Sequence, residues 1–281
     1  MTKLMTITAA KGGVGKTTIA NNYSAWLAQH GQKVLMFDLD ESCNLSHNFD
    51  IYEQKLTVAE LFRSSDEKME MPMIYHVGEN LDLISGDLQL DQIQNKILNE
   101  SNHNQRLFNY LRFLKQTGKF DYDYVIFDCH QNFNVATCNA ILCSHMVLSP
   151  LTPDENGFNA KFEVARRLEH YEKTGDRNPV TNEPLVKAEL KFIGDMIETN
   201  TTLSRELLGV INDDEQVIGY IPKREAFKQA AAVKQDVFTY LNSKEKITPS
   251  LRKFLVTLSA TFTKVTHILE ETPAVLIDQV K

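Results

Sequence analysis

The chain has 281 residues, 42% of them hydrophobic, and carries 30 basic against 37 acidic side chains, a formal net charge of −7. This length and apolar content can bury one large core. The negative balance gives no overall sign of nucleic-acid binding, so any DNA contact has to be local. No apolar run approaches the roughly 18 to 20 residues of a membrane span, and the cysteines form no C-x-x-C pair, which predicts reduced thiols in the cytosol.

Strand-like and helix-like stretches alternate along the chain. Strands are predicted at 4–9, 33–37, 81–85, 124–127, 146–149, 190–197 and 217–221, and helices at 18–30, 57–62, 104–117, up to about 171, 202–211, 226–241 and 249–271. The polar segment 174–187, with its glycine and prolines, is predicted to be a surface loop. This alternation predicts a single α/β domain over 1–281, with a mostly parallel twisted sheet and helices on both faces.

A glycine-rich octet, Lys-Gly-Gly-Val-Gly-Lys-Thr-Thr, lies between the first strand and the first helix. Glycines allow positive φ and let successive backbone N–H groups point at a phosphate. Lys16 supplies a positive charge, and the Thr17 hydroxyl suits Mg²⁺. The octet therefore predicts a nucleotide-binding P-loop formed by Lys11, Gly12, Gly13, Val14, Gly15, Lys16, Thr17 and Thr18.

The octet departs from the usual G-x-x-x-x-G-K-[ST] pattern, because Ala10 stands where the first glycine would be and Lys11 follows it. With this extra lysine it resembles the deviant Walker A motif of the ParA/MinD superfamily of dimerising ATPases, and most of all the ParA-type partition ATPases. The resemblance is specific at 7–46, good at 121–160 and 216–235, and weak at 47–100 and after 240. It implies ATP and Mg²⁺ as cofactors, and a nucleotide sandwich dimer in which Lys11 reaches the partner's phosphates like an arginine finger.

Acidic residues follow two of the predicted strands. Asp38 and Asp40 form the D-x-D that ParA-like proteins carry after their second strand. The resemblance implies that Asp40 lies near the γ-phosphate and is needed for hydrolysis, and it makes Asp38 a further metal candidate. Asp128 resembles the Walker B aspartate, which holds Mg²⁺ through water beside Thr17. The implied catalytic residues are thus Lys11, Lys16 and Asp40.

The sequence differs from its relatives directly after Asp128. Residues 128–131 read Asp-Cys-His-Gln, where relatives read D-x-P-P. The proline pair would stiffen the loop that senses the γ-phosphate, so its absence bears on the hydrolysis rate and on the geometry of switching. The P-loop and the two acidic motifs are nevertheless retained, so the core chemistry is expected to survive.

A segment near the carboxyl end resembles the family's G-x-I-P-R motif. Its proline, here Pro222, is predicted to border the adenine. Basic residues at and after this segment form the concentration that we expect near a DNA-binding surface, with a solvated helical face as the alternative. The DNA-binding candidates are Arg205, Lys223, Arg224, Lys228 and Lys234.

The sequence therefore predicts a slow DNA partition ATPase of the bacterial cytoplasm, associated with the nucleoid. Its expected partners are a second copy upon ATP binding, nonspecific DNA and a centromere-binding, ParB-like adaptor. No membrane contact is expected, because the tail after Pro273 is weakly charged, and no helix-turn-helix domain is expected before the first strand. The alternatives are a MinD-like membrane-associated positioning ATPase, an iron–sulfur carrier and a nucleotide-gated scaffold with little turnover.

Overall fold

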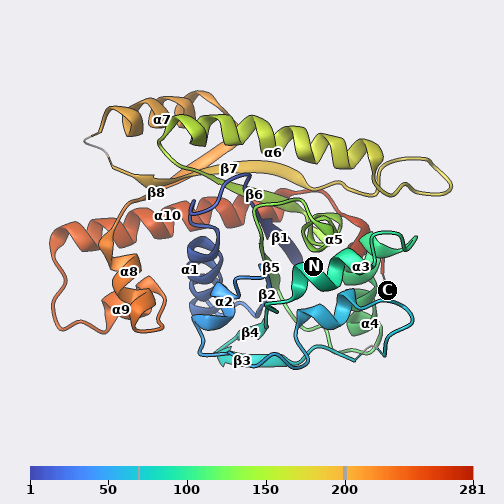
Figure 1. Ribbon diagram of the computed structural model, residues 1–281. Helices are drawn as coiled ribbons and strands as arrows, with labels where there is room; N and C mark the ends of the chain where they lie inside the picture. Colours follow the sequence, from blue (N-terminus) through green and yellow to red (C-terminus); the bar gives the residue numbers. More distant parts are fainter. Residues whose placement is uncertain (69, 199–200, 281) are drawn as a thin grey trace.

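The computed structural model describes residues 1–68, 70–198 and 201–280, and within them an eight-stranded sheet forms the centre of the molecule (Figure 1). The strand order is β3-β4-β2-β5-β1-β6-β7-β8, and every neighbouring pair is parallel except β3–β4. The strands are β1 (Lys3–Ile7), β2 (Val34–Leu39), β3 (Ile74–Gly78), β4 (Leu81–Ile84), β5 (Tyr124–Cys129), β6 (Met146–Leu151), β7 (Glu189–Ile197) and β8 (Val217–Pro222). The predicted mostly parallel α/β sheet is confirmed.

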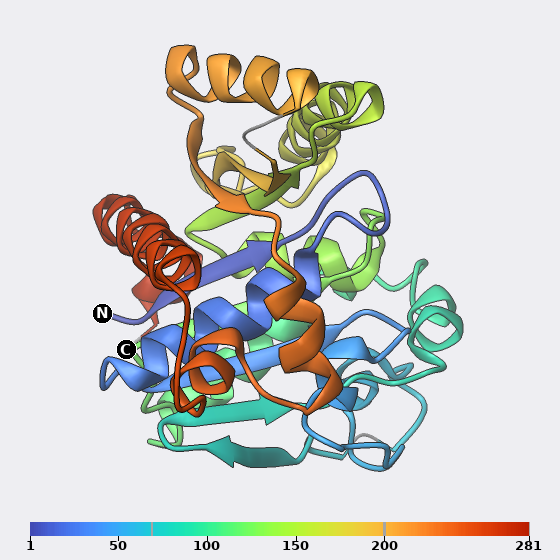
Figure 2. The ribbon, with the colours of Figure 1, turned by 90° about the vertical axis from the view of Figure 1, so that its left-hand side faces the viewer.

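Helices cover both faces of this sheet (Figures 1 and 2). One face carries α1 (Lys16–Gln29), α2 (Asn44–His47), α8 (Glu225–Ala232), α9 (Val237–Asn242) and α10 (Pro249–Glu271). The other carries η1 (Val58–Phe62), α3 (Leu90–Lys96), α4 (Arg106–Gln116), α5 (Val135–Cys143), α6 (Glu155–Thr174) and α7 (Thr202–Asp213). Alternate residues of each strand point into the cores on opposite faces of the sheet. Met36 packs under α1, whereas Phe37 packs under α4. The strands are therefore apolar on both faces.

The C-terminal helix α10 packs across β8 and β1 and beside α1. Thr248 caps it by accepting a hydrogen bond from Leu251 N, and Pro249 occupies its first turn, where no intrahelical donor is needed. Its buried stripe consists of Phe254, Leu258, Phe262, Val265 and Leu269. Since each such side chain contributes roughly 1.5–3 kcal/mol on burial, this stripe fixes α10 to the sheet.

Three parts of the predicted element list were wrong or incomplete. The single helix expected at 226–241 is broken into α8 and α9, because Lys234 adopts a left-handed φ of 56° and Asp236 starts a new helix by capping it. The edge strand β3 and the helices α2, α3 and α5 were not predicted. In α5 nearly every residue is buried, so its sequence shows no polar face from which a helical period can be recognised.

The register of the parallel strands brings the acidic motifs to one edge of the sheet. Asp128 of β5 pairs with Ile7 of β1 on one side and with Asp38 of β2 on the other. The loop that follows β1 therefore lies directly beside Asp128, with Asp38 one strand further along the sheet. Because β1 is flanked by β5 and β6, this edge is also where the direction of chain winding changes, the usual place for a ligand in such sheets.

Candidate nucleotide-binding site

The glycine-rich octet forms a cradle at the start of α1. Gly13 and Gly15 have φ of 72° and 87°, a backbone region that other residues adopt only with strain. Gly15 directly precedes α1, so the first N–H groups of that helix point into the cradle, where an anion is favoured. A cavity of about 390 Å³ opens there, lined by Gly12, Gly13, Val14, Gly15, Lys16, Thr17, Thr18, Asp40, Ser42, Asn44, His130, Gln131 and Met196.

Asp128 lies beside Thr17 and Lys16 of the cradle with its carboxylate fully buried. Within the described part of the chain, neither carboxylate oxygen has a hydrogen-bond partner. Burial raises the pKa of Asp128 well above its usual range, the charge of Asp38 adds to this, and the Thr17 hydroxyl and the Lys16 ammonium act in the opposite direction. A buried carboxylate without donors is costly unless a cation offsets it. The pair of Asp128 and Thr17 therefore fits a hard, oxygen-preferring cation such as Mg²⁺.

Asp38 has a different environment from Asp128. Its carboxylate accepts hydrogen bonds from Ser46 N (2.8 Å), from Ser46 Oγ (2.7 Å) and from Asp40 N (3.3 Å). Burial raises the pKa of Asp38 to about 6, against the effect of these donors. Because protein donors already occupy it, Asp38 acts in this structure as a support for the loop after β2, and its predicted role as a metal ligand stays a prediction.

Asp40 sits on the loop that Asp38 supports. Its Oδ1 accepts a hydrogen bond from Ser42 N (2.9 Å), which closes a tight Asx turn. The side chain is mostly buried and lines the phosphate cavity together with Lys16. The structure thus brings together the predicted P-loop, Asp40 and Asp128. This arrangement is the one required if the P-loop contacts the phosphates and Asp40 orients an attacking water.

The loop without the proline pair is held by hydrogen bonds. The His130 carbonyl accepts from Thr8 Oγ1 (3.0 Å), and the Gln131 carbonyl accepts from Arg167 Nη1 (3.2 Å). The Gln131 side chain lies against the P-loop. Its Oε1 is so close that a Cβ added at Gly12 would be only 2.7 Å from it. Side-chain hydrogen bonds on two sides therefore restrain the loop that lacks the proline pair.

Asp195 of β7 contacts the cradle, and no local motif in the sequence marks this residue. A Cβ added at Gly15 would lie 2.1 Å from Asp195 Oδ2, so this position accepts only glycine. Burial raises the pKa of Asp195 to about 7, and the Met196 N–H opposes that shift. Met196 itself has a left-handed φ of 56° and lines the cavity. β7 and the P-loop are far apart in sequence, so this contact could not be predicted before the fold placed them side by side.

Comparisons with known proteins agree with this geometry. A family model described as an AAA domain matches residues 2–178, more than half of the chain, and the sporulation initiation inhibitor protein Soj of Bacillus subtilis is 32% identical over 153 residues. The chain belongs to the ParA/MinD-type P-loop ATPases. The chromosome partitioning protein ParA of Caulobacter vibrioides is 28% identical over 179 residues. These alignments cover 54% and 63% of this chain and only 58% of Soj and 65% of ParA.

A solved structure supports the fold over nearly the whole chain. The septum site-determining protein MinD of Pyrococcus horikoshii, complexed with Mg-ADP, superposes with a TM-score of 0.69, covers 95% of this chain and 97% of its own, and is 20% identical. At this identity the likeness concerns the ParA/MinD-type fold alone. That neighbour holds its Mg-ADP in a structure of the same architecture.

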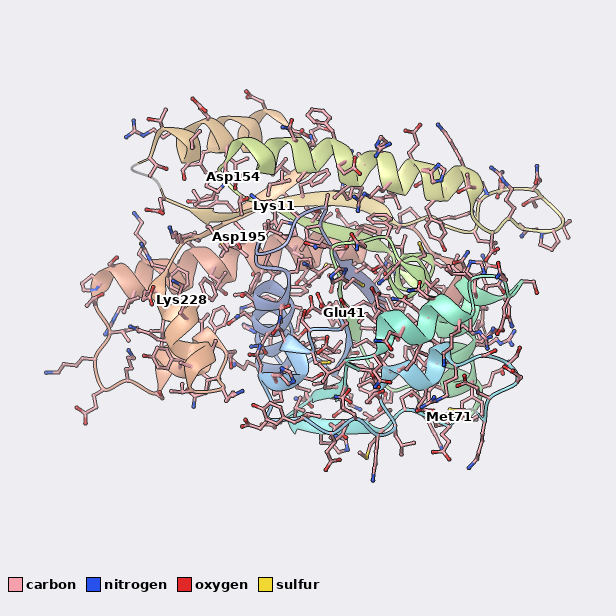
Figure 3. All side chains as sticks on the ribbon, in the orientation of Figure 1. Lys11, Glu41, Met71, Asp154, Asp195 and Lys228 are labelled. Carbon is pink, nitrogen blue, oxygen red and sulfur yellow. The ribbon has the colours of Figure 1, made fainter. Side chains whose placement is uncertain are left out.

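Lys11, the residue that distinguishes ParA/MinD-type loops, does not line the phosphate cavity of its own chain. Its ammonium is paired with Asp154, at 3.0 Å from Oδ1 and 3.1 Å from Oδ2 (Figure 3). Asp154 follows β6 and immediately precedes α6. In this ParA/MinD-type chain the signature lysine therefore points toward β6 and α6 rather than into its own P-loop.

The remaining predicted residues lie apart from the phosphate cavity. Pro222, Lys223, Arg224 and Lys228 line a separate hollow of about 560 Å³, where Lys223 pairs with Glu198 at 2.6 Å. Lys234 lines another cavity beside α1 and α9, and Arg205 lies on α7. Three of the five basic candidates thus share one hollow, whereas the turn between α8 and α9 carries Lys234 toward Asp50, 3.6 Å away. Contact of Pro222 with adenine stays a prediction.

Proposed function

We propose that this chain is an ATP-dependent DNA partition protein. Mg-ATP would drive two copies face to face, the dimer would hold nonspecific DNA, and hydrolysis to ADP and phosphate would release it. The observation that carries the proposal is that Lys16 and Asp40 line one phosphate cavity with Asp128 buried beside Lys16 and Thr17, whereas the Lys11 side chain is paired with Asp154 away from that cavity. A lysine that does not line its own phosphate cavity is suited to contact a partner's phosphates.

The residues of the site have distinct tasks in this proposal. The P-loop amides and Lys16 hold the β- and γ-phosphates, and Thr17 with Asp128 holds the magnesium, whose charge offsets that of the phosphates. Asp40 lines the same cavity and orients the attacking water. Lys11 of the second copy adds positive charge when two loaded chains meet, so turnover depends on dimerisation.

The surface proposed for DNA is the exposed basic set around the start of α8. Lys223, Arg224 and Lys228 are all exposed and share one hollow. Glu198 and Glu225 pair with two of these cations, at 2.6 Å and 3.7 Å, and so reduce the charge that one copy presents. A dimer presents the set twice, which makes binding by phosphate neutralisation stronger for two chains than for one.

A centromere-binding, ParB-like partner would stimulate hydrolysis, which is slow without it, and the protein would act in the bacterial cytoplasm on the nucleoid. The Soj and ParA names of relatives support this context. No helix in the described part of the chain is long and apolar enough to cross a membrane. The apolar stripe of α10 is used in packing on the sheet.

A nucleotide-gated scaffold with little turnover is the second candidate. The observation favouring it is the contact of Gln131 with Gly12 in the loop that lacks the proline pair. In this reading ATP still closes the dimer, but the polar loop positions the attacking water poorly. Phosphate release measured with DNA and with partner distinguishes the two functions, since the scaffold would stay slow under both conditions.

The variant Asp40→Ala tests the proposed cycle. It should bind ATP and dimerise but hydrolyse at least about 100-fold more slowly, because a water-orienting carboxylate is lost. DNA retention at a fixed salt concentration should then persist long after wild-type protein has released its DNA, and it should require ATP rather than ADP. Retention that is equal with ATP, with ADP and without nucleotide would rule out the nucleotide-controlled DNA cycle.

A further inference from the structure

A separate cavity of about 430 Å³ lies beside the C-terminal half of α1. It is enclosed by α1, by the turn between β3 and β4 and by the start of α9, which lie side by side in Figure 2. A pocket of this volume can hold a small organic ligand. The cavity shares no lining residue with the nucleotide site, so the nucleotide leaves it available for a second ligand.

Asn21 of α1 presents an unused amide to this cavity. The residue is only 6% exposed and lies in the cavity wall. Its side chain makes no hydrogen bond with the part of the chain that the structure describes. The neighbouring Asn22, by contrast, uses both ends of its amide, toward Thr18 O (2.7 Å) and Val237 N (2.7 Å). Because buried amides normally have partners, Asn21 is placed to bind a group that enters the cavity.

The wall of the cavity is electronegative. Glu79, in the turn between β3 and β4, lies in it and forms no ion pair with any residue of the described ranges. Asp236 lies in it as well and is held in place because it caps α9. The helix α1 ends at the cavity with no basic residue in its last turn, so the partial negative charge of a helix C-terminus is not offset there.

Lys234 also lies in the wall but does not reverse this balance. Its ammonium donates to the His47 carbonyl and to Tyr52 Oη (3.1 Å), and it lies 3.6 Å from Asp50 Oδ1. These three acceptors belong to the segment at and after the end of α2 and are not part of the cavity wall. The charge of Lys234 is therefore offset from outside the cavity, which leaves the acidic groups inside it to attract a cation.

We propose that this cavity binds an organic cation, an ammonium or guanidinium group on a short aliphatic stem. The charged head donates to Asn21 Oδ1 and lies beside Glu79, because these are the unpaired acceptors of the wall. The stem packs on an apolar surface made of Ala25, Ala28, Phe49, Val77 and Leu81. A free amine carries this chemistry, and so does a lysine or arginine side chain of a partner protein.

The test uses N-acetylarginine amide as the probe and N-acetylcitrulline amide, which has nearly the same shape without the charge, as its control. In NMR titrations of the isotope-labelled full chain, the arginine probe should shift the signals of the Asn21 side-chain amide and of the Gly31 backbone amide. Those of Gly13 and Gly15 in the P-loop should stay unchanged. A ligand of about 15 non-hydrogen atoms with ordinary binding energy per atom has a dissociation constant of about 0.5 mM. The citrulline probe should bind at least about 10-fold more weakly.

Agmatine, titrated in parallel, distinguishes the two sources of the cation. Binding as tight as that of the arginine probe indicates a free amine. Weaker binding indicates a side chain that a protein presents, since agmatine has the guanidinium and the stem but no peptide groups.

Two variants test where the probe binds. Asn21→Ala loses no hydrogen bond of the free protein and introduces a strong helix former, so it should fold normally and bind the arginine probe at least about 10-fold more weakly. Glu79→Gln, in an exposed turn, should weaken binding by about 1.4- to 5-fold. Glu206→Gln, exposed on α7 across the sheet, is the matched control and should leave it unchanged. Equal affinity for the two probes, no saturable shift, or full affinity in Asn21→Ala or Glu79→Gln overturns the proposal.

Discussion

Replacing Lys16 by alanine should raise the dissociation constant for Mg-ATP by about 30- to 3000-fold and abolish ATP hydrolysis. Lys16 is mostly buried in the cradle and is the residue that we propose to hold the β- and γ-phosphates of its own chain's nucleotide. Truncating one member of a buried charge pair costs about 2–5 kcal/mol, which corresponds to this range. Titration calorimetry with a non-cleavable ATP analogue measures the affinity directly.

The matched control for this variant is Lys33→Ala. Lys33 precedes β2, is half exposed and pairs with Asp121, away from the phosphate cavity. Its replacement should leave the affinity for Mg-ATP within about two-fold of the wild-type value, since surface substitutions rarely have larger effects. An equal loss in both variants, or none in Lys16→Ala, would mean that the octet does not bind the phosphates.

The variant Asp128→Asn should have opposite effects on activity and stability. Magnesium-dependent hydrolysis should fall by about 10- to 100-fold, the usual loss when a group that orients a metal is replaced. The nucleotide-free chain should nevertheless become more stable at neutral pH by about 1–3 kcal/mol, because the amide removes a buried charge without hydrogen-bond donors. Thermal unfolding in EDTA, without nucleotide, measures the gain.

The pH dependence of that gain follows from the pKa of Asp128, which burial raises in the folded chain. A raised folded-state pKa means that folding favours the protonated acid, so the ionised carboxylate lowers stability as the pH rises through the folded value. The advantage of Asp128→Asn should therefore be present at neutral pH and disappear as the pH falls toward about 4, the unfolded value. A variant that is less stable than wild type at neutral pH would show that the carboxylate is well solvated or paired.

The parts of the site that could be predicted from sequence are those encoded locally. The P-loop is contiguous, and its strand, glycines and helix follow one another in the chain, so its place at the start of α1 could be expected. The nearness of Asp40 to Asp128 could also be expected, because both follow apolar strands and the ends of parallel strands share one edge.

The parts that could not be predicted depend on tertiary packing. Asp195 reaches Gly15, and Asp154 reaches Lys11, across long separations in sequence and without any motif at either residue. The break at Lys234 involves neither glycine nor proline, so no turn residue marks it. The place of Lys234 could not be predicted for the same reason, since that break directs it toward Asp50, away from the hollow that Lys223, Arg224 and Lys228 share.

The most direct test of the proposed dimerisation is the molecular mass of the protein in solution. Light scattering of purified protein with a non-cleavable ATP analogue and Mg²⁺ should show a dimer, and a monomer with ADP or without nucleotide. Lys11→Ala should bind the analogue with nearly wild-type affinity and yet stay monomeric, because each copy then lacks the lysine ammonium that would contact the other copy's phosphates. Wild-type protein that stays monomeric when saturated with the analogue, or a Lys11→Ala variant that dimerises normally, would contradict it.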